Sequence, residues 1–299
     1  MNDERVEGQA MGETQRTGAD DSLAGSGDEG QVADVTHAEA SLVSEIREQY
    51  KLRVDFHRAE KRLTLQIKAI CRRLVAGDPK TNKARAQELY KRIKSQAIDP
   101  ETVAFTTYWS DLWTCREVLK KQRLSHEREL EKLAKQLPVW TWVESMRGFG
   151  PLGLGLIVGE CGDLAMYANP AKLWKRMGLA LVNGERQRKH TDPELSLLHG
   201  YAPERRAVMF VIGDSLVKCS GSPYRDLYLS RKLYEQERAE AAGMKVVPSA
   251  KLPKGKRSNG GEYMTVGHIH NRAQRYMEKR LLRDLWRAWR GRLVADDTR

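Results

Sequence analysis

The residues best suited to a chemical task form one short stretch, Gly148-Phe149-Gly150-Pro151. An apolar residue between two glycines, followed by a proline that can open a helix, is typical of the turn in a helix-hairpin-helix motif. Glycine adopts backbone angles closed to other residues and leaves no side chain in the way, so a phosphate can approach such a turn. Phe149 would point inward and join the two helices, while free N–H groups at the start of the second helix face the phosphate. An ordinary helical corner is the alternative.

Basic residues stand where they could add phosphate contacts. Arg147 precedes the turn, and Arg186, Arg188 and Lys189 form a compact basic loop further along the chain. Contacts to phosphates position a nucleic acid without reading its sequence. We expect these four residues and the turn at 148–151 to bind DNA phosphates; a solvated loop is the alternative for the later three.

The last helical segment is rich in arginine, and we favour contact with the backbone of DNA or RNA there. Its tryptophans, Trp286 and Trp289, fit a core better than a base-stacking platform. The basic residues of this segment are Arg272, Arg275, Lys279, Arg280, Arg283, Arg287, Arg290 and Arg292.

Other chemistry-bearing residues lack the neighbours that a site needs. Glu160 and Asp163 are three residues apart near a helix end, which is commonplace and a weak indication of metal binding. His268 and His270 have no third ligand nearby, so turn or surface positions are favoured. The four cysteines lie far apart and include no CxxC pair, so the sequence predicts neither structural zinc nor a disulfide framework.

The elements that would position these residues are helices, and the expected fold class is mainly α. Apolar residues three and four apart predict long helices before residue 137, and helical patterns return at about 203–218, 223–241 and 265–290. The predicted domains are a disordered acidic tail at 1–36, a long antiparallel helical hairpin or coiled coil at 37–137, and a helix-hairpin-helix domain at 138–292 with a basic loop at 247–261.

Composition narrows the class of partner. The 299 residues carry a formal net charge of +12, but residues 1–40 hold ten acidic residues and only two arginines, so the rest carries +20. A basic body indicates a polyanionic partner. No stretch approaches the roughly 18 apolar residues of a membrane span, and the N-terminus is acidic rather than signal-like. We therefore expect a soluble, cytoplasmic, nucleoid-associated protein with no membrane partner, whose acidic tail is solvated or mimics a nucleic acid.

Several segments together resemble one protein family. Gly148-Phe149-Gly150-Pro151, Gly159-Glu160-Cys161-Gly162-Asp163 and the run from Asn169 to Ala180 look like the C-terminal transposase domain of insertion-sequence transposases of the one-hundred-and-ten family. Members of that family are RuvC-like DEDD recombinases related to Piv-type invertases, and some are guided by a structured RNA. The resemblance is specific over roughly 139–292 and looser over 46–137.

The resemblance implies a DNA-binding protein associated with DNA transposition and site-specific recombination, in which Asp163 would be a capping residue. The family's RuvC-like domain and its four metal-binding acidic residues have no counterpart in residues 1–36, and the segment at 178–190 lacks the family's nucleophilic serine. We therefore expect a catalytically incomplete protein that holds DNA or structured RNA and binds no cofactor itself. A divalent metal would come with a separate RuvC-like subunit, and the long helices would suit a homo-oligomer.

Two other functions remain open. Ser196 is the nearest downstream serine, and an active recombinase would have to use such a displaced nucleophile; without a neighbouring base, Ser196 fits a loop or cap better. The second is a helical scaffold or dimerisation protein with no nucleic-acid role.

Overall fold

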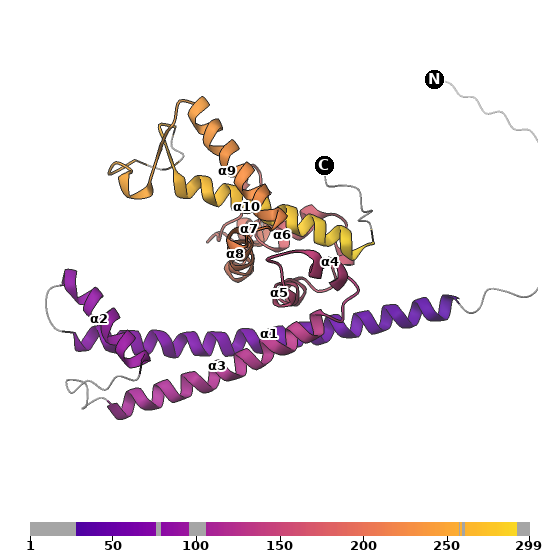
Figure 1. Ribbon diagram of the computed structural model, residues 1–299, viewed down its shortest axis with the longest axis horizontal. Coiled ribbons are helices and arrows are strands. Elements are labelled where there is room, and N and C mark those ends of the chain that lie inside the picture. The colour runs from indigo at the N-terminus through magenta and orange to yellow at the C-terminus, as the bar shows by residue number, and fades with distance from the viewer. Residues whose placement is uncertain (1–27, 76–78, 96–105, 257, 259–260, 292–299) are drawn as a thin grey trace, which may run out of the picture. The chain divides into compact units, whose positions relative to one another are not determined.

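The computed structural model describes residues 28–75, 79–95, 106–256, 258 and 261–291, and it divides into two units, residues 1–38 and 39–299. Most described residues are helical, so the predicted mainly α class is confirmed. Figure 1 shows the helices α1 (Asp28–Leu74), α2 (Pro79–Lys94), α3 (Thr106–Ala134), α4 (Trp140–Ser145), α5 (Pro151–Cys161), α6 (Pro170–Arg176), α7 (Pro193–His199), α8 (Pro203–Lys218), α9 (Pro223–Ala241) and α10 (Val266–Trp289).

Helix boundaries follow the local capping chemistry. A proline occupies the first turn of each helix from α5 to α9. The side chains of Asn169, Asp192 and Thr265 accept hydrogen bonds from backbone N–H groups three residues on, which satisfies donors that a helix start leaves free. The helices α8 and α9 have no side-chain cap, but they begin at Pro203 and Pro223 and end where the sequence predicts.

One helix begins earlier than the sequence predicts, and another predicted helix start lies outside the described residues. The first helix begins at Asp28, before the predicted start at residue 37, so residues 28–36 are helical rather than part of a tail. Residues 1–27 of the predicted tail lie outside the described residues. The predicted N-cap at Asp99 of the helix that becomes α3 lies outside them as well.

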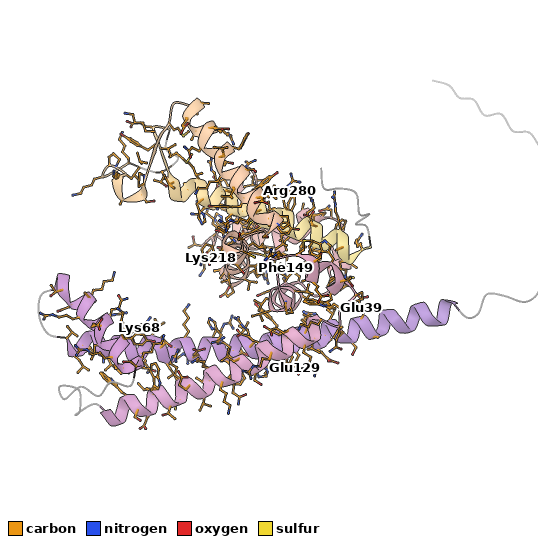
Figure 2. All side chains as sticks on the ribbon, viewed as in Figure 1. Glu39, Lys68, Glu129, Phe149, Lys218 and Arg280 are labelled. Carbon is orange, nitrogen blue, oxygen red and sulfur yellow. The ribbon has the colours of Figure 1, made fainter. Side chains whose placement is uncertain are left out.

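The helices α1 and α3 run antiparallel, because their partners pair in reverse order. Gln49 meets His126, Arg53 meets Glu127 at 3.0 Å, and further along α1 Glu60 meets both Arg116 and Arg123. Figure 2 marks the two helices by Lys68 and Glu129. A small cluster around Ile67, Cys71 and Ala86 packs α2 onto them.

The main core surrounds α5, which is buried over Leu154–Val158 and packs against α3, α4 and α8. Two glycines allow this close packing. A Cβ on Gly155 would lie 3.2 Å from the Leu130 carbonyl oxygen of α3, and a Cβ on Gly159 would lie 2.4 Å from the Tyr50 ring of α1. The same core continues into α6, α8, α9 and α10 and includes Val43, Ile46 and Tyr50, so it joins the middle of α1 to the C-terminal helices.

Strands are short in the part of the chain that the structure describes. β1 (Leu181–Val182) and β2 (Glu185–Arg186) form an antiparallel hairpin, while β3 (Lys245–Val247) and β4 (Tyr263–Thr265) pair in parallel. The predicted basic loop at 247–261 therefore connects two paired strands, and it contains a short 3₁₀ turn, η3 (Ser249–Lys251). Residues 257 and 259–260 of that loop lie outside the described residues.

Among the described helices, none is both long and apolar enough to cross a membrane.

Candidate nucleic-acid interface

The turn between α4 and α5 has the backbone that its glycines favour. Gly148 has a φ of +88°, a region in which residues with a side chain are strained, and Pro151 opens α5. Phe149 is 3% exposed, and its ring meets Trp142 edge-on with 6.5 Å between the ring centroids. Phe149 therefore points into the core, where it joins the two helices and is not presented to a ligand.

The two glycines of this turn have different surroundings. A Cβ on Gly148 would lie 2.8 Å from the Cβ of Cys219 at the end of α8, and Ser215 Oγ donates a hydrogen bond of 3.2 Å to the Gly148 carbonyl oxygen. A Cβ on Gly150 would meet nothing within 4 Å. Gly148 is therefore needed for the close approach of α8, and only Gly150 leaves the open space that a phosphate would require.

The start of α5 also offers backbone donors. Its first helical hydrogen bond runs from Leu154 N to Gly150 O at 3.2 Å, so the N–H groups of Leu152 and Gly153 have no helical acceptor. Arg147 is exposed beside the turn. This end of α5 thus combines free donors, a helix N-terminus and one cation.

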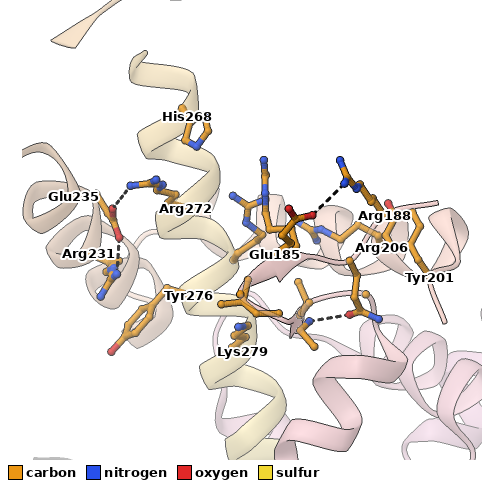
Figure 3. A pocket seen from close by; sticks show the side chains of 18 of the residues that line it. Glu185, Arg188, Tyr201, Arg206, Arg231, Glu235, His268, Arg272, Tyr276 and Lys279 are labelled. Carbon is orange, nitrogen blue, oxygen red and sulfur yellow. Dashed lines mark hydrogen bonds and ion pairs between the residues drawn. The ribbon is translucent and has the colours of Figure 1, made fainter. Parts of the chain in front are cut away.

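A separate and more strongly basic cleft lies near the start of α8. It has a volume of about 740 Å³ and lies between the β1–β2 hairpin, the first turn of α8, and the helices α9 and α10 (Figure 3). Of its charged residues, only Glu185 and Glu235 are acidic. The basic ones are Arg186, Arg188, Arg206, Arg231, Arg238, Arg272, Arg275 and Lys279.

One face of α10 forms a wall of this cleft. His268, Arg272, Arg275 and Lys279 all line it, and they are spaced by four, three and four residues. That spacing places side chains on one face of a helix. Figure 3 shows α10 passing between α9, which carries Glu235, and the hairpin, which carries Glu185.

Some of these cations are neutralised and others are not. Glu235, which is 3% exposed, accepts from Arg231 at 2.5 Å and from Arg272 at 3.1 Å. Arg188 pairs with Glu185 at 3.1 Å, and Arg206 pairs with the buried Glu278 at 2.9 Å. Within the described part of the chain, no ion pair holds the remaining four, Arg186, Arg238, Arg275 and Lys279.

Burial and neighbouring charges shift several pKa values in and behind the cleft. Burial, together with the nearby guanidinium groups of Arg186 and Arg206, lowers the pKa of Arg275 to about 10. Burial and the charge of Arg275 lower the pKa of Lys279 as well. Burial raises the pKa of Glu278 to about 7, against the opposing effect of Arg206. The cleft therefore holds cations that lower one another's pKa.

The β1–β2 hairpin positions Arg186 and Arg188 at this cleft. Asn183 and Gly184 both have positive φ, 51° and 78°, as a two-residue type I′ turn requires. The buried Gln187 fixes the hairpin: its Oε1 accepts from Ala180 N at 2.9 Å, and its Nε2 donates to the carbonyl oxygens of Lys175 and His199. The Asn-Gly pair between two short apolar or charged segments was the sequence signal for this hairpin, which was predicted only as a loop.

The residues predicted to bind phosphates thus lie in two places. Arg186 and Arg188 line the cleft, while Lys189 is exposed beside it. The turn at 148–151 packs, through Gly148, against Leu216 of α8 and Cys219 just after it. The cleft, in contrast, is lined by Arg206 near the start of α8. At 1.5 Å per residue, Arg206 and Leu216 are roughly 15 Å apart along α8.

Sequence reasoning did not single out Arg206, Arg231 or Arg238 as site residues. All three line the cleft, and they come from α8 and α9, far from the basic loop in sequence. In the local sequence, Arg205-Arg206 is a pair of adjacent arginines at the start of a helix, which does not by itself indicate a phosphate site. Nothing in the local sequence indicates that these helices meet α10.

The carboxylates and the serine considered for chemistry have other surroundings. Glu160 accepts from Tyr50 at 2.7 Å and from Arg205 at 3.1 Å, and Asp163 caps the 3₁₀ turn η2 (Leu164–Met166) and accepts from Trp289 at 2.9 Å. Ser196 is exposed on α7. In the residues that are described, no group of three or more His, Cys, Asp or Glu side chains is placed to hold a metal ion.

A comparison with protein-family models, curated proteins and solved structures finds no match to this chain. The resemblance to insertion-sequence transposases therefore stays a prediction.

Proposed function

We propose that the protein binds the phosphate backbone of a nucleic acid, and that the cleft between the β1–β2 hairpin and α10 is the principal site. The observation that carries the proposal is the set of cations that no ion pair holds, above all the half-buried Arg275, whose charge the nearby Arg186 and Arg206 oppose. Holding like charges together away from water is unfavourable, and a polyanionic ligand removes that penalty by pairing with them.

The proposed binding is independent of base sequence. Arginine presents several donors in a planar fork that matches phosphate oxygens, and such contacts fix the position of a nucleic acid without reading its bases. Neutralising phosphates releases counterions, so the affinity should fall steeply as the salt concentration rises.

The turn at residues 148–151 is a second candidate contact within the same proposal. Its open side at Gly150, the free N–H groups of α5 and the exposed Arg147 suit one phosphate. We propose that this turn and its two helices act as a helix-hairpin-helix element, and that one nucleic acid contacts both the turn and the cleft along α8.

The biological setting comes from the sequence resemblance alone. If the chain is related to those transposases, it acts in DNA transposition as a part that holds DNA, or a structured RNA, while a separate RuvC-like subunit supplies the metal site. Strand transfer is not part of the proposal, because the exposed Ser196 has no base hydrogen-bonded to its hydroxyl among the described residues.

Fluorescence anisotropy of a labelled DNA duplex, titrated with protein over a series of salt concentrations, tests the proposal. We expect binding whose dissociation constant rises steeply with salt. The double variant Arg186→Gln, Arg188→Gln should lower the salt slope by about one to two, since each lost phosphate contact removes about 0.9.

The matched control is Lys121→Gln, Arg128→Gln, which removes the same charge from exposed positions on α3. Weakening by the cleft variant alone would support the proposal. Equal weakening by both variants would point to diffuse attraction, and the absence of binding at low salt to either DNA or RNA would contradict the function.

A further inference from the structure

The basic cleft is a recess rather than an open surface. The Arg206 side chain is 20% exposed and its partner Glu278 is fully buried. Arg275 and Lys279 are half-buried on α10, whereas Arg186 and Arg188 are exposed on the hairpin that forms the opposite wall. A ligand that pairs with Arg275 therefore lies between the hairpin and α10, the two walls of the recess.

The size of the recess favours a ligand of one or two nucleotides. Its volume of about 740 Å³ falls within the roughly 300–1,000 Å³ of sites that enclose small molecules. An intact duplex carries its phosphates on a stiff rod with a persistence length of about 50 nm, so it cannot bend into such a space. An unpaired strand is flexible and can direct a phosphate inward.

The recess also offers an aromatic ring at its edge. Tyr201 lies on the same side as Arg188 and Arg206 (Figure 3), and its ring packs over the backbone of Gly178, where a Cβ would lie 3.3 Å from it. Aromatic rings beside cations are the usual platform for unpaired bases, which stack on them without regard to sequence. The other tyrosine of the recess, Tyr276, is already covered by Arg231 at 4.6 Å and Arg280 at 5.0 Å.

We propose that this recess binds a phosphate of an unpaired nucleic-acid strand, with Arg275 and Arg206 at its inner end, Arg186 at its mouth and Tyr201 stacking on a base. The inference rests on the proposed function and specifies its substrate class. The duplex then lies outside the recess, and a displaced strand or a strand end enters it.

If Arg275 had a purely structural role, its replacement should lower the stability of the fold. Within the described residues Arg275 makes no hydrogen bond or ion pair, and burial and its arginine neighbours oppose its charge more than the nearby Glu278 favours it. Arg275→Gln should therefore keep or raise the melting temperature while it weakens binding. Loss of activity with gain of stability is typical of a ligand site.

The test compares two probes and three proteins in the same buffer. A labelled single-stranded oligonucleotide and the duplex of the same sequence are titrated with the wild type, with Arg275→Gln and with Arg283→Gln. Arg283 is the matched control, because it lies on α10, pairs with Asp284 at 2.7 Å and does not line the recess. The same titrations are made with Arg186→Gln. This residue is exposed on the β1–β2 hairpin, so its replacement leaves the buried part of the fold unchanged.

We expect the wild type to bind the single strand more tightly than the duplex, and Arg275→Gln to weaken the single strand about tenfold or more, as loss of a charge-assisted contact does. The effect of Arg275→Gln on the duplex should equal that of Arg283→Gln. Arg186→Gln, at the exposed mouth of the recess, should weaken the single strand more than it weakens the duplex.

Three results would overturn the inference. Equal weakening of single strand and duplex by Arg275→Gln would assign the recess to the duplex and leave the proposed function standing. Competition by a free nucleoside monophosphate as strong as that by the oligonucleotide would make the ligand a small molecule. Failure of both probes to bind at low salt would remove the inference together with the proposed function.

Discussion

Arg206 Nη1 lies 2.9 Å from Glu278 Oε2, and the carboxyl side chain of Glu278 is completely buried. Burial raises the pKa of Glu278 to about 7, while Arg206, Gln274 and Arg275 favour its charged form. The charge behind the basic cleft thus changes near neutral pH: Glu278 is neutral below about pH 7 and ionised above it.

Affinity for a nucleic acid should therefore increase as the pH falls from 8 to 6. Protonation of Glu278 removes one negative charge from the vicinity of Arg206 and Arg275, so a phosphate competes with one carboxylate fewer. We expect a change of about fivefold, equivalent to roughly 1 kcal/mol. Anisotropy at constant ionic strength measures it, since phosphodiesters do not titrate in this range.

Glu278→Gln is the control for this pH dependence. It should bind at pH 8 about as tightly as the wild type does at pH 6. His268 also lines the cleft, but burial and the charges of Arg272 and Arg186 lower its pKa, so its contribution belongs below pH 6.5. An unchanged pH dependence in Glu278→Gln would show that another group titrates.

The turn at residues 148–151, between α4 and α5, gives a second prediction, because its two glycines can be replaced separately. Gly148→Ala would place a side chain at a φ of +88° and 2.8 Å from the Cys219 Cβ, so we expect it to destabilise the fold by about 1–3 kcal/mol. Gly150→Ala would meet nothing within 4 Å, and its φ of −102° suits any residue, so the melting temperature should barely change.

Nucleic-acid binding by Gly150→Ala then reports on the turn alone. If a phosphate lies against Gly150, the added methyl group weakens binding while the fold is retained. Unchanged affinity would remove the turn from the interface and leave the cleft. A Gly148 variant cannot make this distinction, since its binding would fall with its stability.

Local sequence patterns predicted the helices better than the site. Pro203 and Pro223 mark helix starts by their own chemistry, and Phe149 between two glycines indicates an inward-pointing residue. Each of these signals lies within a few residues. The arginines on one face of α10 could also be recognised by their spacing.

The cleft depends on packing between distant segments, which no local pattern encodes. Whether Arg272 or Arg275 remains unpaired depends on where Glu235 of α9 lies, and Glu235 pairs with Arg272. Similarly, the sequence around Gly148 is compatible with a phosphate contact and with close packing of another helix. The structure places Cys219, at the end of α8, against Gly148. The sequence therefore indicates an excess of basic residues, whereas the packing of the helices determines which of them have a carboxylate partner.

The packing of α5 on α1 makes a third prediction. A Cβ on Gly159 would lie 2.4 Å from the Tyr50 ring, and that ring is held in place by the hydrogen bond from Tyr50 Oη to Glu160 at 2.7 Å. We expect Gly159→Ala to lower the free energy of unfolding by about 1–3 kcal/mol, as overpacking does. Urea denaturation measures the loss, and Gly150→Ala is the control. An equal stability of the two variants would mean that α5 and α1 are not in contact.

The paired helices α1 and α3 make the last prediction, through Glu60. This carboxylate is 8% exposed and accepts from Arg116 at 3.2 Å and Arg123 at 2.8 Å, and Arg123 also reaches Glu127 at 2.8 Å. Glu60→Ala removes the carboxylate that two mostly buried guanidinium groups share, although Arg116 keeps Glu117 and Arg123 keeps Glu127, so we expect a loss of about 1–3 kcal/mol. Arg123→Ala should cost less, because Arg116 still neutralises Glu60 and Arg53 still pairs with Glu127. A thermal-unfolding cycle of both single variants and the double variant should give a coupling of about 0.5–3 kcal/mol between them; additive effects would show that Glu60 and Arg123 do not interact.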